Sequence, residues 1–458
     1  MLYNKEWFIM LRSMISRGCS VSFFGVGRSN ISLLSALPLQ NCRVTIRSDK
    51  KIDRSLLPKG VFIERIFEGE RALCDINEDI IFFSPSVRRE RAEFQAARER
   101  GVIFSSDAEL FFEENKAPVF AVTGSDGKST TATLISLLLQ AGGVRSELIG
   151  NIGRPMTEAL SRAAEAYVCE LSSFMLQYIS PPSVRACITN ITPNHLDWHE
   201  SLGEYKKTKL AVAKKCDGLV ISEENLEISG AYAIACDRSD FKALRKRYDA
   251  ELYITSEGGY ICKNGAPILA LESVRRKERH NIKNLMMAIA MTDGFVGYDG
   301  IRSVAESFCG LEHRCKRILS LDGVDYIDSS IDSTPARTVA TLTSLDRRVV
   351  ILLGGRGKGL DYRELLPALC KHAAYTVIAG ENADEIYKAV GKEVKAQVLP
   401  DFNSAVERGI DLAKEVGALL LSPASTSFDM FKNYAERGKK FKEIVLKWHN
   451  MTIQVYKS

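Results

Sequence analysis

The stretch PVFAVTGSDGKSTTATLISLLLQAGG, residues 118–143, decides the fold class of this chain. Its first six residues are mostly apolar and predict a buried strand, and the run from Ser129 predicts a helix that ends at two glycines. A short turn of small, polar and glycine residues joins the two. A buried strand followed at once by a helix is the repeating unit of α/β proteins, so we expect a parallel sheet covered by helices.

The turn itself, TGSDGKST, has the chemistry of a phosphate-binding loop. Two glycines let successive N–H groups face one anion, and the helix adds its positive N-terminal end. The lysine can reach the β- and γ-phosphates of ATP, and the following serine can bind Mg²⁺. Val122 replaces the first glycine of the usual motif, and the alternative is a plain turn with a solvated lysine. The expected ATP contacts are Gly124, Ser125, Asp126, Gly127, Lys128, Ser129 and Thr130.

Strand and helix signals alternate on both sides of this unit. Strands are predicted at residues 21–25, 44–47, 79–83, 166–171, 185–191, 218–222, 324–328, 349–354, 375–379 and 418–422, and helices at 281–293 and 429–447. We expect an α/β chain of three domains. They are a Rossmann-like domain at 1–116, a central P-loop ATPase domain with a mostly parallel sheet at 117–321, and a Rossmann-like domain at 322–458.

Composition narrows the class of protein. The 458 residues include 62 Lys and Arg and 57 Asp and Glu. The resulting net charge of +5 does not support a nucleic-acid-binding protein. The 11 cysteines include no CxxC pair, which fits a reducing compartment and argues against disulfides or structural zinc. No apolar run is long enough to span a bilayer, and residues 1–18 lack a signal-peptide core. We expect a cytoplasmic protein without membrane insertion.

A second glycine motif, GVGRSN at residues 25–30, follows the first predicted strand. A dinucleotide fingerprint would have glycine at Asn30 and an acidic residue at the end of the next strand, which instead ends in Arg47 and Ser48. These two residues suit phosphate better than a ribose, so a diphosphate-bearing substrate is favoured over NAD. Asp49 keeps the NAD interpretation open, and a plain tight turn is a further alternative.

Several motifs together resemble the Mur ligase family over nearly the whole chain. They are TGSDGKST, GNIG (150–153), CELSSF (169–174), NITPNHLDWH (190–199), RHNIKN (279–284), EHR (312–314) and GGRGKG (354–359). The segment SPASTSFDMFKNYAERGKKF, residues 422–441, and the first glycine motif resemble the branch that uses D-glutamate. The resemblance implies a UDP-substrate domain, a central ATPase domain and a C-terminal amino-acid domain.

The implied activity is an ATP-dependent ligation in peptidoglycan synthesis. ATP phosphorylates the carboxylate of UDP-N-acetylmuramoyl-L-alanine, and the amine of D-glutamate attacks the acyl phosphate to form an amide. Because both substrates are anionic, metal ions and cationic side chains are needed to screen them. The resemblance further implies two Mg²⁺ ions and a monomeric protein.

The resemblance also assigns roles to single residues. The implied catalytic and metal-binding residues are Lys128, Ser129, Glu170, His195 and Lys209, with Lys209 carbamylated by CO₂. Asn281 and Asn284 lie three apart on one helix face, where both amides could read adenine, and Arg314 would contact an ATP phosphate. The implied substrate contacts are Arg28, Ser29, Arg47, Ser48, Asn151, Ser333, Lys358, Ser427 and the backbone of Tyr434.

One segment departs from the family pattern. In YIDSSIDSTPART, residues 326–338, Ile331 stands where the family lysine would be, and Ser329 and Ser333 replace an aspartate and a threonine. Ser333 can still donate a hydroxyl, and Asp328 or Asp332 can replace the missing acid. The loss of a cation weakens the assignment of the amino acid.

Three other functions stay open at this point. A different ligase of the family would add another amino acid, although a folate-type ligase would lack the separate first domain. An NAD-dependent oxidoreductase would leave Lys128, Glu170 and the third domain without a role. A non-catalytic nucleotide sensor would keep the phosphate loop but would not need Glu170, His195 and Lys209.

Overall fold

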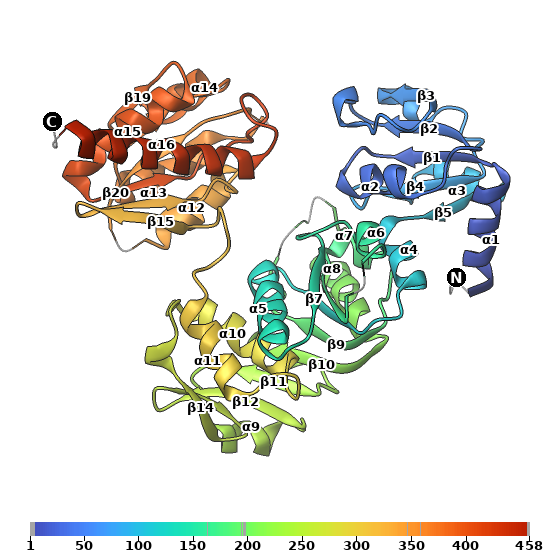
Figure 1. Cartoon of the computed structure of the whole chain (residues 1–458), viewed down its shortest axis with the longest axis horizontal. Coiled ribbons are helices and arrows are strands. Elements are labelled where there is room, and N and C mark those ends of the chain that lie inside the picture. The colour runs from blue at the N-terminus through green and yellow to red at the C-terminus, as the bar shows by residue number, and fades with distance from the viewer. Residues whose placement is uncertain are drawn as a thin grey trace. The chain divides into compact units, whose positions relative to one another are not determined.

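The N-terminal sheet has five parallel strands in the order β3-β2-β1-β4-β5 (Figure 1). Both faces are buried, one by apolar residues of α1, α2 and α4 and the other by residues of α3. This double burial explains the continuous apolar runs of the central strands. The strands are β1 (Ser20–Phe24), β2 (Arg43–Ser48), β3 (Ile63–Glu68), β4 (Ile80–Phe83) and β5 (Ile103–Ser105). The helices are α1 (Lys5–Arg17), α2 (Arg28–Ala36), η1 (Arg54–Leu56), η2 (Gly69–Leu73), α3 (Ala92–Glu99) and α4 (Asp107–Glu114).

The central sheet has nine strands in the order β14-β13-β12-β11-β10-β9-β6-β8-β7. It is parallel from β7 to β12, and only β13 and β14 run antiparallel. The strands are β6 (Val119–Thr123), β7 (Ser146–Gly150), β8 (Ala166–Glu170), β9 (Ser183–Ile188), β10 (Cys216–Ser222), β11 (Ala233–Cys236), β12 (Leu252–Glu257), β13 (Tyr260–Lys263) and β14 (Ala266–Ala270).

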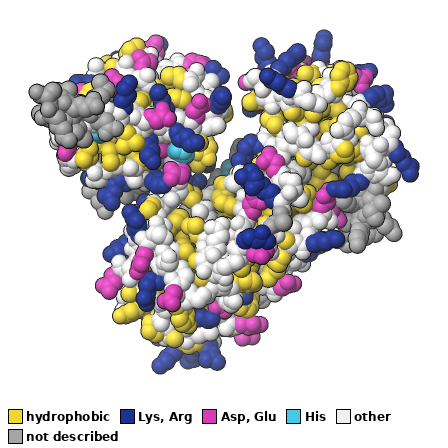
Figure 2. All heavy atoms as spheres, in the orientation of Figure 1, with side chains coloured by type: hydrophobic (Ala, Val, Ile, Leu, Met, Phe, Trp, Pro, Cys, Tyr) yellow, Lys and Arg dark blue, Asp and Glu magenta, His cyan; other side chains and the backbone are white. Residues whose placement is uncertain are grey.

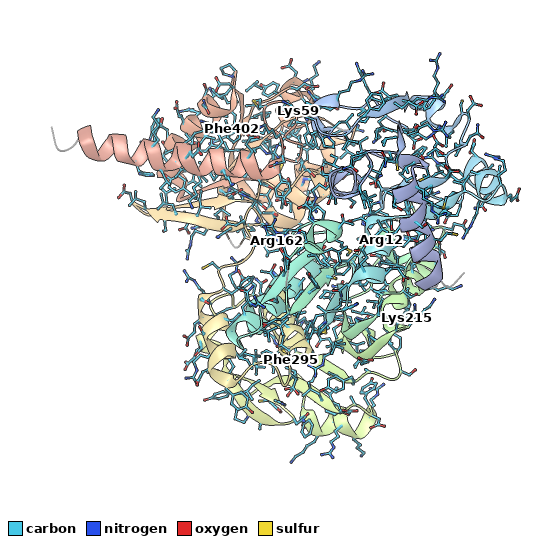
Figure 3. All side chains as sticks on the ribbon, turned by 45° about the vertical axis from the view of Figure 1, so that its right-hand side comes forward. Arg12, Lys59, Arg162, Lys215, Phe295 and Phe402 are labelled. Atoms are coloured by element: carbon cyan, nitrogen blue, oxygen red, sulfur yellow. The ribbon has the colours of Figure 1, made fainter. Side chains whose placement is uncertain are left out.

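Helices cover both faces of this sheet, and the buried α5 packs against α10 and α11 (Figure 1). The ring of Phe295, labelled in Figure 3, lies 5.3 Å from that of Phe120 in β6. The helices are α5 (Lys128–Ala141), α6 (Met156–Ala159), α7 (Ser173–Leu176), α8 (Leu202–Lys209), η3 (Leu210–Ala213), η4 (Glu223–Asn225), α9 (Phe241–Arg247), η5 (Leu271–Ser273), α10 (Arg279–Met291) and α11 (Tyr298–Ser307). The loop between β6 and α5 is thereby fixed at the carboxyl edge of the sheet.

The C-terminal sheet has six strands in the order β15-β16-β20-β17-β18-β19, and only β15 is antiparallel. One face carries α15 and α16, and the other carries α12, α13 and α14. The strands are β15 (Lys316–Leu321), β16 (Val324–Asp328), β17 (Val349–Leu353), β18 (Ala373–Ile378), β19 (Ala396–Val398) and β20 (Ala418–Leu421). The helices are α12 (Pro335–Thr343), η6 (Tyr362–Leu365), α13 (Leu366–His372), α14 (Ala383–Val390), α15 (Phe402–Val416) and α16 (Tyr434–Val455).

The structure is a computed structural model that describes residues 5–455 apart from 163, 194, 196, 197, 346 and 358. The chain forms two compact units, residues 1–308 and 309–458, the second being called the C-terminal unit below. Basic and acidic side chains are interspersed over the visible face of each (Figure 2). Among the described residues, no helix combines the length and the apolarity needed to cross a bilayer.

The three sheets confirm the predicted α/β class with its mostly parallel central sheet. Two details differ from the sequence prediction. The last helix begins at Tyr434 rather than at residue 429, because residues 422–433 form an irregular loop after β20. Strand β15 already pairs with β16, so the third sheet starts before the boundary expected at 321/322. The exact domain limits stay a prediction.

Candidate active site

The loop between β6 and α5 needs glycine at two positions for a physical reason. Gly124 has φ +147°, and a Cβ atom there would lie 1.9 Å from Oγ1 of Thr189. Gly127 has φ +76°, and its Cβ would lie 2.4 Å from Oδ1 of Asn284. Both dihedrals lie where side chains are rarely tolerated, and both positions face a neighbouring segment. The loop is therefore pressed against residues 189–190 and the start of α10, which leaves its outer side for a ligand.

The N–H groups of the loop are divided between two tasks. Those of Ser125 and Asp126 donate to Oδ1 of Asn190, at 3.1 and 2.8 Å. The Ser125 hydroxyl donates to the carbonyl of Thr192. The backbone N–H groups of Ser125 and Asp126 thus have protein partners, and the ATP contacts predicted for these two residues stay a prediction. In the first turn of α5, Lys128, Ser129 and Thr130 carry N–H groups that no helical carbonyl can satisfy, and this turn stays the predicted phosphate cradle.

Two lysines meet at one carbonyl of this loop. Nζ of Lys128 donates to the carbonyl oxygens of Gly124 and Ser125 at 2.8 and 2.6 Å. Nζ of Lys209, from the end of α8, donates to the same Gly124 oxygen at 2.7 Å. The side chain of Lys209 is buried and its Nζ lies 4.6 Å from the ring centre of Tyr205. Lys128 and Lys209, both predicted as site residues, thus lie together, and their catalytic roles stay predictions.

The buried position of Lys209 changes its chemistry. Burial, and to a smaller extent the neighbouring Lys128, lower the pKa of its ammonium group to about 7, while Asp126 and Glu170 act in the opposite direction. An ordinary lysine is almost entirely charged at neutral pH. The lowered pKa of Lys209 favours its neutral amine, which is the form that reacts with electrophiles such as CO₂.

Glu170 is the buried carboxylate of the site. It ends β8, whose register places it beside Val122 of β6, two residues before Gly124. Oε1 of Glu170 accepts a hydrogen bond from Nδ2 of Asn151 at 2.7 Å. Oε2 is buried and has no hydrogen-bond partner within the described part of the chain. A carboxylate oxygen left in this state needs a cation or a proton donor that the protein itself does not supply.

The structure gives fewer contacts for the other residues that were predicted in the central site. His195 has φ +53° and an exposed ring that lies 5.0 Å from Phe174, and its role as a metal ligand stays a prediction. Asn284 accepts a hydrogen bond from Thr131 of α5 at 3.3 Å, whereas Asn281 donates to Glu278. Both amides lie on the buried face of α10. Asn284 thus belongs to the wall of the phosphate loop, and adenine recognition stays a prediction.

Arg47 does not bind substrate through a free guanidinium, contrary to the sequence prediction. Its side chain is 1% exposed and pairs with Glu78 at 2.8 Å. The remaining donors reach the backbone carbonyls of Ala72, Cys74 and Asp75. All five N–H groups of the guanidinium are therefore satisfied by the protein. Arg47 holds the segment 72–78 against β2, and this burial could not be read from the strand end alone.

The rest of the first glycine motif forms a tight turn after β1. Nδ2 of Asn30 donates to the carbonyls of Phe24, Gly25 and Phe82, which ties β1 to β4 where the fingerprint would have a glycine. Ser29 lies in the first turn of α2, and the Ser48 hydroxyl oxygen accepts from the N–H of Lys50. Arg28 donates to backbone carbonyls of residues 150–153 rather than lying free.

Asp49, which kept the NAD interpretation open, forms a two-fold ion pair with Arg91, both distances being 2.7 Å. A carboxylate held in this way has less freedom to accept hydrogen bonds from a ribose. The pair therefore favours the diphosphate interpretation of the first glycine motif.

In the C-terminal unit, the segments predicted to bind the amino acid lie together. Backbone hydrogen bonds in both directions join Arg356 to Thr426, at 2.9 and 3.1 Å. They bring the glycine-rich loop after β17 beside Ser427, which is buried. The carbonyl of Tyr434 accepts from the Ser330 hydroxyl at 2.8 Å. Lys358 lies outside the described residues, and the roles of Ser333 and Arg314 stay predictions.

A buried cation that sequence reasoning missed stands at the centre of this cluster. Arg437 of α16 is 1% exposed and donates to the carbonyls of Ser330, Ser425 and Thr426. Burial lowers its pKa to about 10. Within the described residues it has no carboxylate at ion-pair distance, so it joins α16 to two backbone segments, at Ser330 and at 425–426, rather than balancing one charge. The loss of the family lysine at Ile331 therefore does not leave this region without a cation.

The central site also contains supporting residues that the sequence did not mark as functional. Thr189 and Asn190 bond to the backbone of Asp126 and Ser125, and the hydroxyl of Tyr205 lies 3.0 Å from that of Ser125. Thr189 and Asn190 follow β9, and β9 lies next to β6 in the sheet. Polar residues at the carboxyl ends of adjacent parallel strands are a usable signal, but only once the strand order is known.

The residues present fit a hard divalent cation. Among the described residues, no three His, Cys, Asp or Glu side chains come together, so a complete protein cage of such ligands is absent there. Mg²⁺ does not need one, because it is typically held by one or two carboxylates, substrate phosphates and water. The unpartnered Oε2 of Glu170 at the edge that carries the phosphate loop is the observation that supports this fit.

Comparisons with known proteins agree over almost the full length. Residues 122–292 match the Mur ligase middle domain, and residues 313–425 match the Mur ligase glutamate ligase domain. UDP-N-acetylmuramoylalanine–D-glutamate ligase of Clostridium tetani is 34% identical, covering 93% of this chain and 96% of the relative. The enzyme of the same name from Clostridium novyi is 32% identical over 94% and 97%.

Solved structures show the same fold. UDP-N-acetylmuramate-alanine ligase MurC from Thermotoga maritima superposes with a TM-score of 0.58 at 19% identity, over 94% of this chain and 99% of that one. Folylpolyglutamate synthase from the same organism reaches 0.51 at 11% identity, over 67% of this chain and 86% of that one. At these identities the likeness concerns the fold alone.

Proposed function

This chain belongs to the Mur ligase family of ATP-dependent ligases, and we propose that it joins D-glutamate to UDP-N-acetylmuramoyl-L-alanine. The choice of substrates rests on the full-length similarity to ligases named for that reaction. The first glycine motif, with Asp49 paired to Arg91, supports a UDP substrate over NAD. The product is an amide that extends the peptide of a peptidoglycan precursor.

One structural observation carries the chemical part of the proposal. The parallel pairing of β6 with β8 brings the phosphate loop and the buried carboxylate of Glu170 to the same sheet edge. A nucleotide-binding turn alone would suit a sensor as well as an enzyme. Glu170 is a buried carboxylate with an unpartnered oxygen, and two lysines converge next to it. Burying such a group costs folding free energy, and the arrangement suits the transfer of a phosphoryl group.

Each residue of the central site has its own role in this reaction. The N-terminal turn of α5 binds the phosphate chain of ATP, and Lys128 neutralises the charge that moves toward the leaving group. Glu170 and Ser129, with His195 and a carbamylated Lys209, would hold Mg²⁺, which screens the anionic reactants when bound. The acceptor carboxylate becomes an acyl phosphate, and the amine of D-glutamate attacks its carbonyl carbon and releases phosphate. Enclosure by the protein keeps water from the acyl phosphate.

The carbamate on Lys209 has independent physical support. As an ammonium group, Lys209 places a second positive charge beside Lys128, and this repulsion contributes to its lowered pKa. Addition of CO₂ to the neutral amine releases a proton and converts the cation into an anion. A carbamate next to Lys128 replaces a repulsion by an attraction, and it adds an oxygen ligand for a divalent cation.

In the C-terminal unit, we propose that Ser427, Lys358 and the Tyr434 backbone bind D-glutamate, with Ser333 as a further donor. The bridge between Arg356 and Thr426 supports this grouping, since it holds two of the three segments together. The first unit would supply Asn151 to the substrate or to the transferred phosphate. A cytoplasmic site of action agrees with cysteines that are all free.

The deciding experiment is phosphate release from ATP with substrates added singly and together. We expect release only when UDP-N-acetylmuramoyl-L-alanine, D-glutamate and Mg²⁺ are all present. Equal turnover with L-alanine, L-lysine or meso-diaminopimelate in place of D-glutamate would contradict the substrate assignment and leave the ligase class intact. Hydride transfer with NAD would contradict both.

A further inference from the structure

Helix α2 of the N-terminal sheet is bonded to the segment 150–157 of the central sheet. Nη2 of Arg28 donates to the carbonyls of Asn151 and Gly150, at 3.0 and 3.5 Å, and Nη1 donates to that of Gly153 at 3.2 Å. One turn further along α2, the hydroxyls of Ser32 and Thr157 lie 3.0 Å apart. The first residue of the helix thus holds the GNIG turn, and a later residue holds its continuation.

The turn is shaped so that its carbonyls converge on one donor. Gly150 and Gly153 have φ +100° and +71°, and a Cβ on either would meet backbone oxygens at 2.5 and 2.1 Å. The N–H of Gly150 donates to the carbonyl of Arg154, which closes the turn. Three carbonyl oxygens pointing one way need a donor, and the planar fork of a guanidinium can serve all three.

The opposite side of the same turn holds the carboxylate of Glu170. The N–H of Asn151 donates to the carbonyl of Glu170 at 2.9 Å, and its Nδ2 donates to Oε1 at 2.7 Å. Glu170 is fully buried, so its orientation depends on these contacts. A shift of Asn151 by a few tenths of an ångström would therefore reorient Oε2, the oxygen available to a cation.

We propose that Arg28 is a positioning residue, which acts from the N-terminal sheet through Asn151 to orient the Glu170 carboxylate. The inference rests on the proposed role of Glu170 as a ligand of Mg²⁺. Three of the five guanidinium N–H groups of Arg28 donate to carbonyls of this turn, which favours a positioning role; the sequence prediction that Arg28 binds substrate is the alternative that the test below separates from it. The same helix follows the glycine turn proposed to bind UDP, so α2 joins the substrate turn to the metal carboxylate.

The test compares three full-length variants. Arg28→Met keeps an unbranched aliphatic side chain and removes the hydrogen-bond donors. Arg28→Lys keeps the positive charge but loses the planar guanidinium group. Ser32→Ala is the control on the same helix. Substitution of a residue that orients a metal ligand typically changes metal affinity about 10- to 100-fold. Arg28 contacts the proposed ligand Glu170 only through Asn151. For Arg28→Met we expect half-maximal Mg²⁺ to rise by about tenfold and kcat to fall, with KM for the UDP substrate changed by less than about twofold. Arg28→Lys should be intermediate, and Ser32→Ala should keep the metal dependence.

A second measurement separates this inference from the proposed reaction. Calorimetric binding of the β,γ-imido analogue of ATP at several Mg²⁺ concentrations requires no turnover, so it remains informative if the substrates are wrong. In the Asn151→Ala background, Arg28→Met should have no further effect on metal dependence, because the two residues act in series. A raised KM for the UDP substrate with unchanged metal dependence would overturn the proposal and restore Arg28 as a substrate ligand. Additive effects of Arg28→Met and Asn151→Ala would also overturn it.

Discussion

Nζ of Lys209 donates a hydrogen bond of 2.7 Å to the carbonyl oxygen of Gly124, the residue at which the phosphate loop begins. Lys128 donates to the same oxygen, so the two amines converge on a single acceptor. Such a pair is stable only when one member is neutral, modified or compensated by an anion. The lowered pKa of Lys209 shows that its charged form is disfavoured in this buried position.

Replacement of Lys209 by alanine should remove most of the ligase activity, and acetate or another short-chain carboxylate should restore part of it. The reason is that the proposed carbamate supplies an anion that a small carboxylate can replace in the vacated space. ¹³C-bicarbonate should give a carbamate resonance in the wild-type protein that the variant lacks. Lys214→Ala, an exposed lysine near the end of the same segment, is the matched control. A wild-type protein without this resonance, and a variant that carboxylates do not rescue, would contradict the carbamate.

Replacement of Lys128 by alanine should lower kcat by about 10²- to 10³-fold, as loss of one preorganised charge donor typically does. Lys128 is the first residue of α5, and its side chain returns over the loop toward Gly124 and Ser125. The backbone cradle should survive, so binding of ADP should weaken less than turnover. The two quantities are measured by calorimetry and by phosphate release. Normal turnover in the variant would refute the phosphate loop as the catalytic site.

Gly124→Ala tests the packing of the loop rather than its charge. The added Cβ would approach Thr189 to within van der Waals overlap, at a φ angle that alanine strongly disfavours. Strain and overpacking together should cost about 2–5 kcal/mol, which is visible as a lower midpoint of thermal unfolding. ATP binding should be lost as well. Gly143→Ala has a positive φ but open space around the Cβ, so it should show the smaller conformational cost alone.

Much of the fold could be predicted because the central strands are buried on both faces. Runs such as Val349–Leu353 and Ile80–Phe83 are continuously apolar, which few other structures require. Several strands that sequence reasoning missed, such as β3, β14, β15 and β19, lie at sheet edges, although the buried interior strands β11 and β12 were missed as well. Strand β3 is half-exposed along its length, and β13 and β14 form an antiparallel extension without a helix between them. Their residues carry no continuous apolar signal.

Site residues that lie close together in one sequence motif could be predicted. Residues whose role depends on burial in the folded chain could not. Lys128 and Gly124 belong to one loop and could be placed from the sequence. Arg47 lies near the end of a strand, as an anion ligand would, yet a segment that includes Glu78 encloses it. Asn190 reaches the loop only because β9 happens to be the neighbour of β6. Strand order and burial are tertiary properties, and no local pattern carries them.

Arg47→Met should destabilise the fold rather than weaken substrate binding selectively. It leaves Glu78 as an unpaired carboxylate with 8% side-chain exposure, and breaking such a buried pair typically costs about 3–5 kcal/mol. Urea unfolding should show a lower midpoint, while KM for the UDP substrate in the remaining folded enzyme should stay close to the wild-type value. The double variant Arg47→Met, Glu78→Leu should recover part of the lost stability, because no charge is left unpaired. A stable Arg47→Met protein with a raised KM would restore the original prediction.

The last prediction concerns the pH dependence of stability in the C-terminal unit. Burial raises the pKa of Asp332, although hydroxyls of Thr341 and Ser422 donate to its Oδ2 at 2.7 Å. A carboxyl whose pKa is higher in the folded than in the unfolded state binds its proton more tightly when folded. Its unfavourable contribution is therefore absent below the unfolded pKa and fully present above the folded one.

Asp332→Asn cannot ionise, and its amide oxygen can accept from the same two hydroxyls. The variant should therefore unfold at a higher temperature than the wild type at pH 8, and this advantage should shrink as the pH falls toward 4.5. Differential scanning fluorimetry of the full chain across this range measures the difference directly. Asp249→Asn, at an exposed aspartate, controls for the general effect of removing one negative charge. A wild-type protein that is more stable than Asp332→Asn at pH 8 would show that the ionised carboxylate is favourable, and that a cation faces it in the folded state.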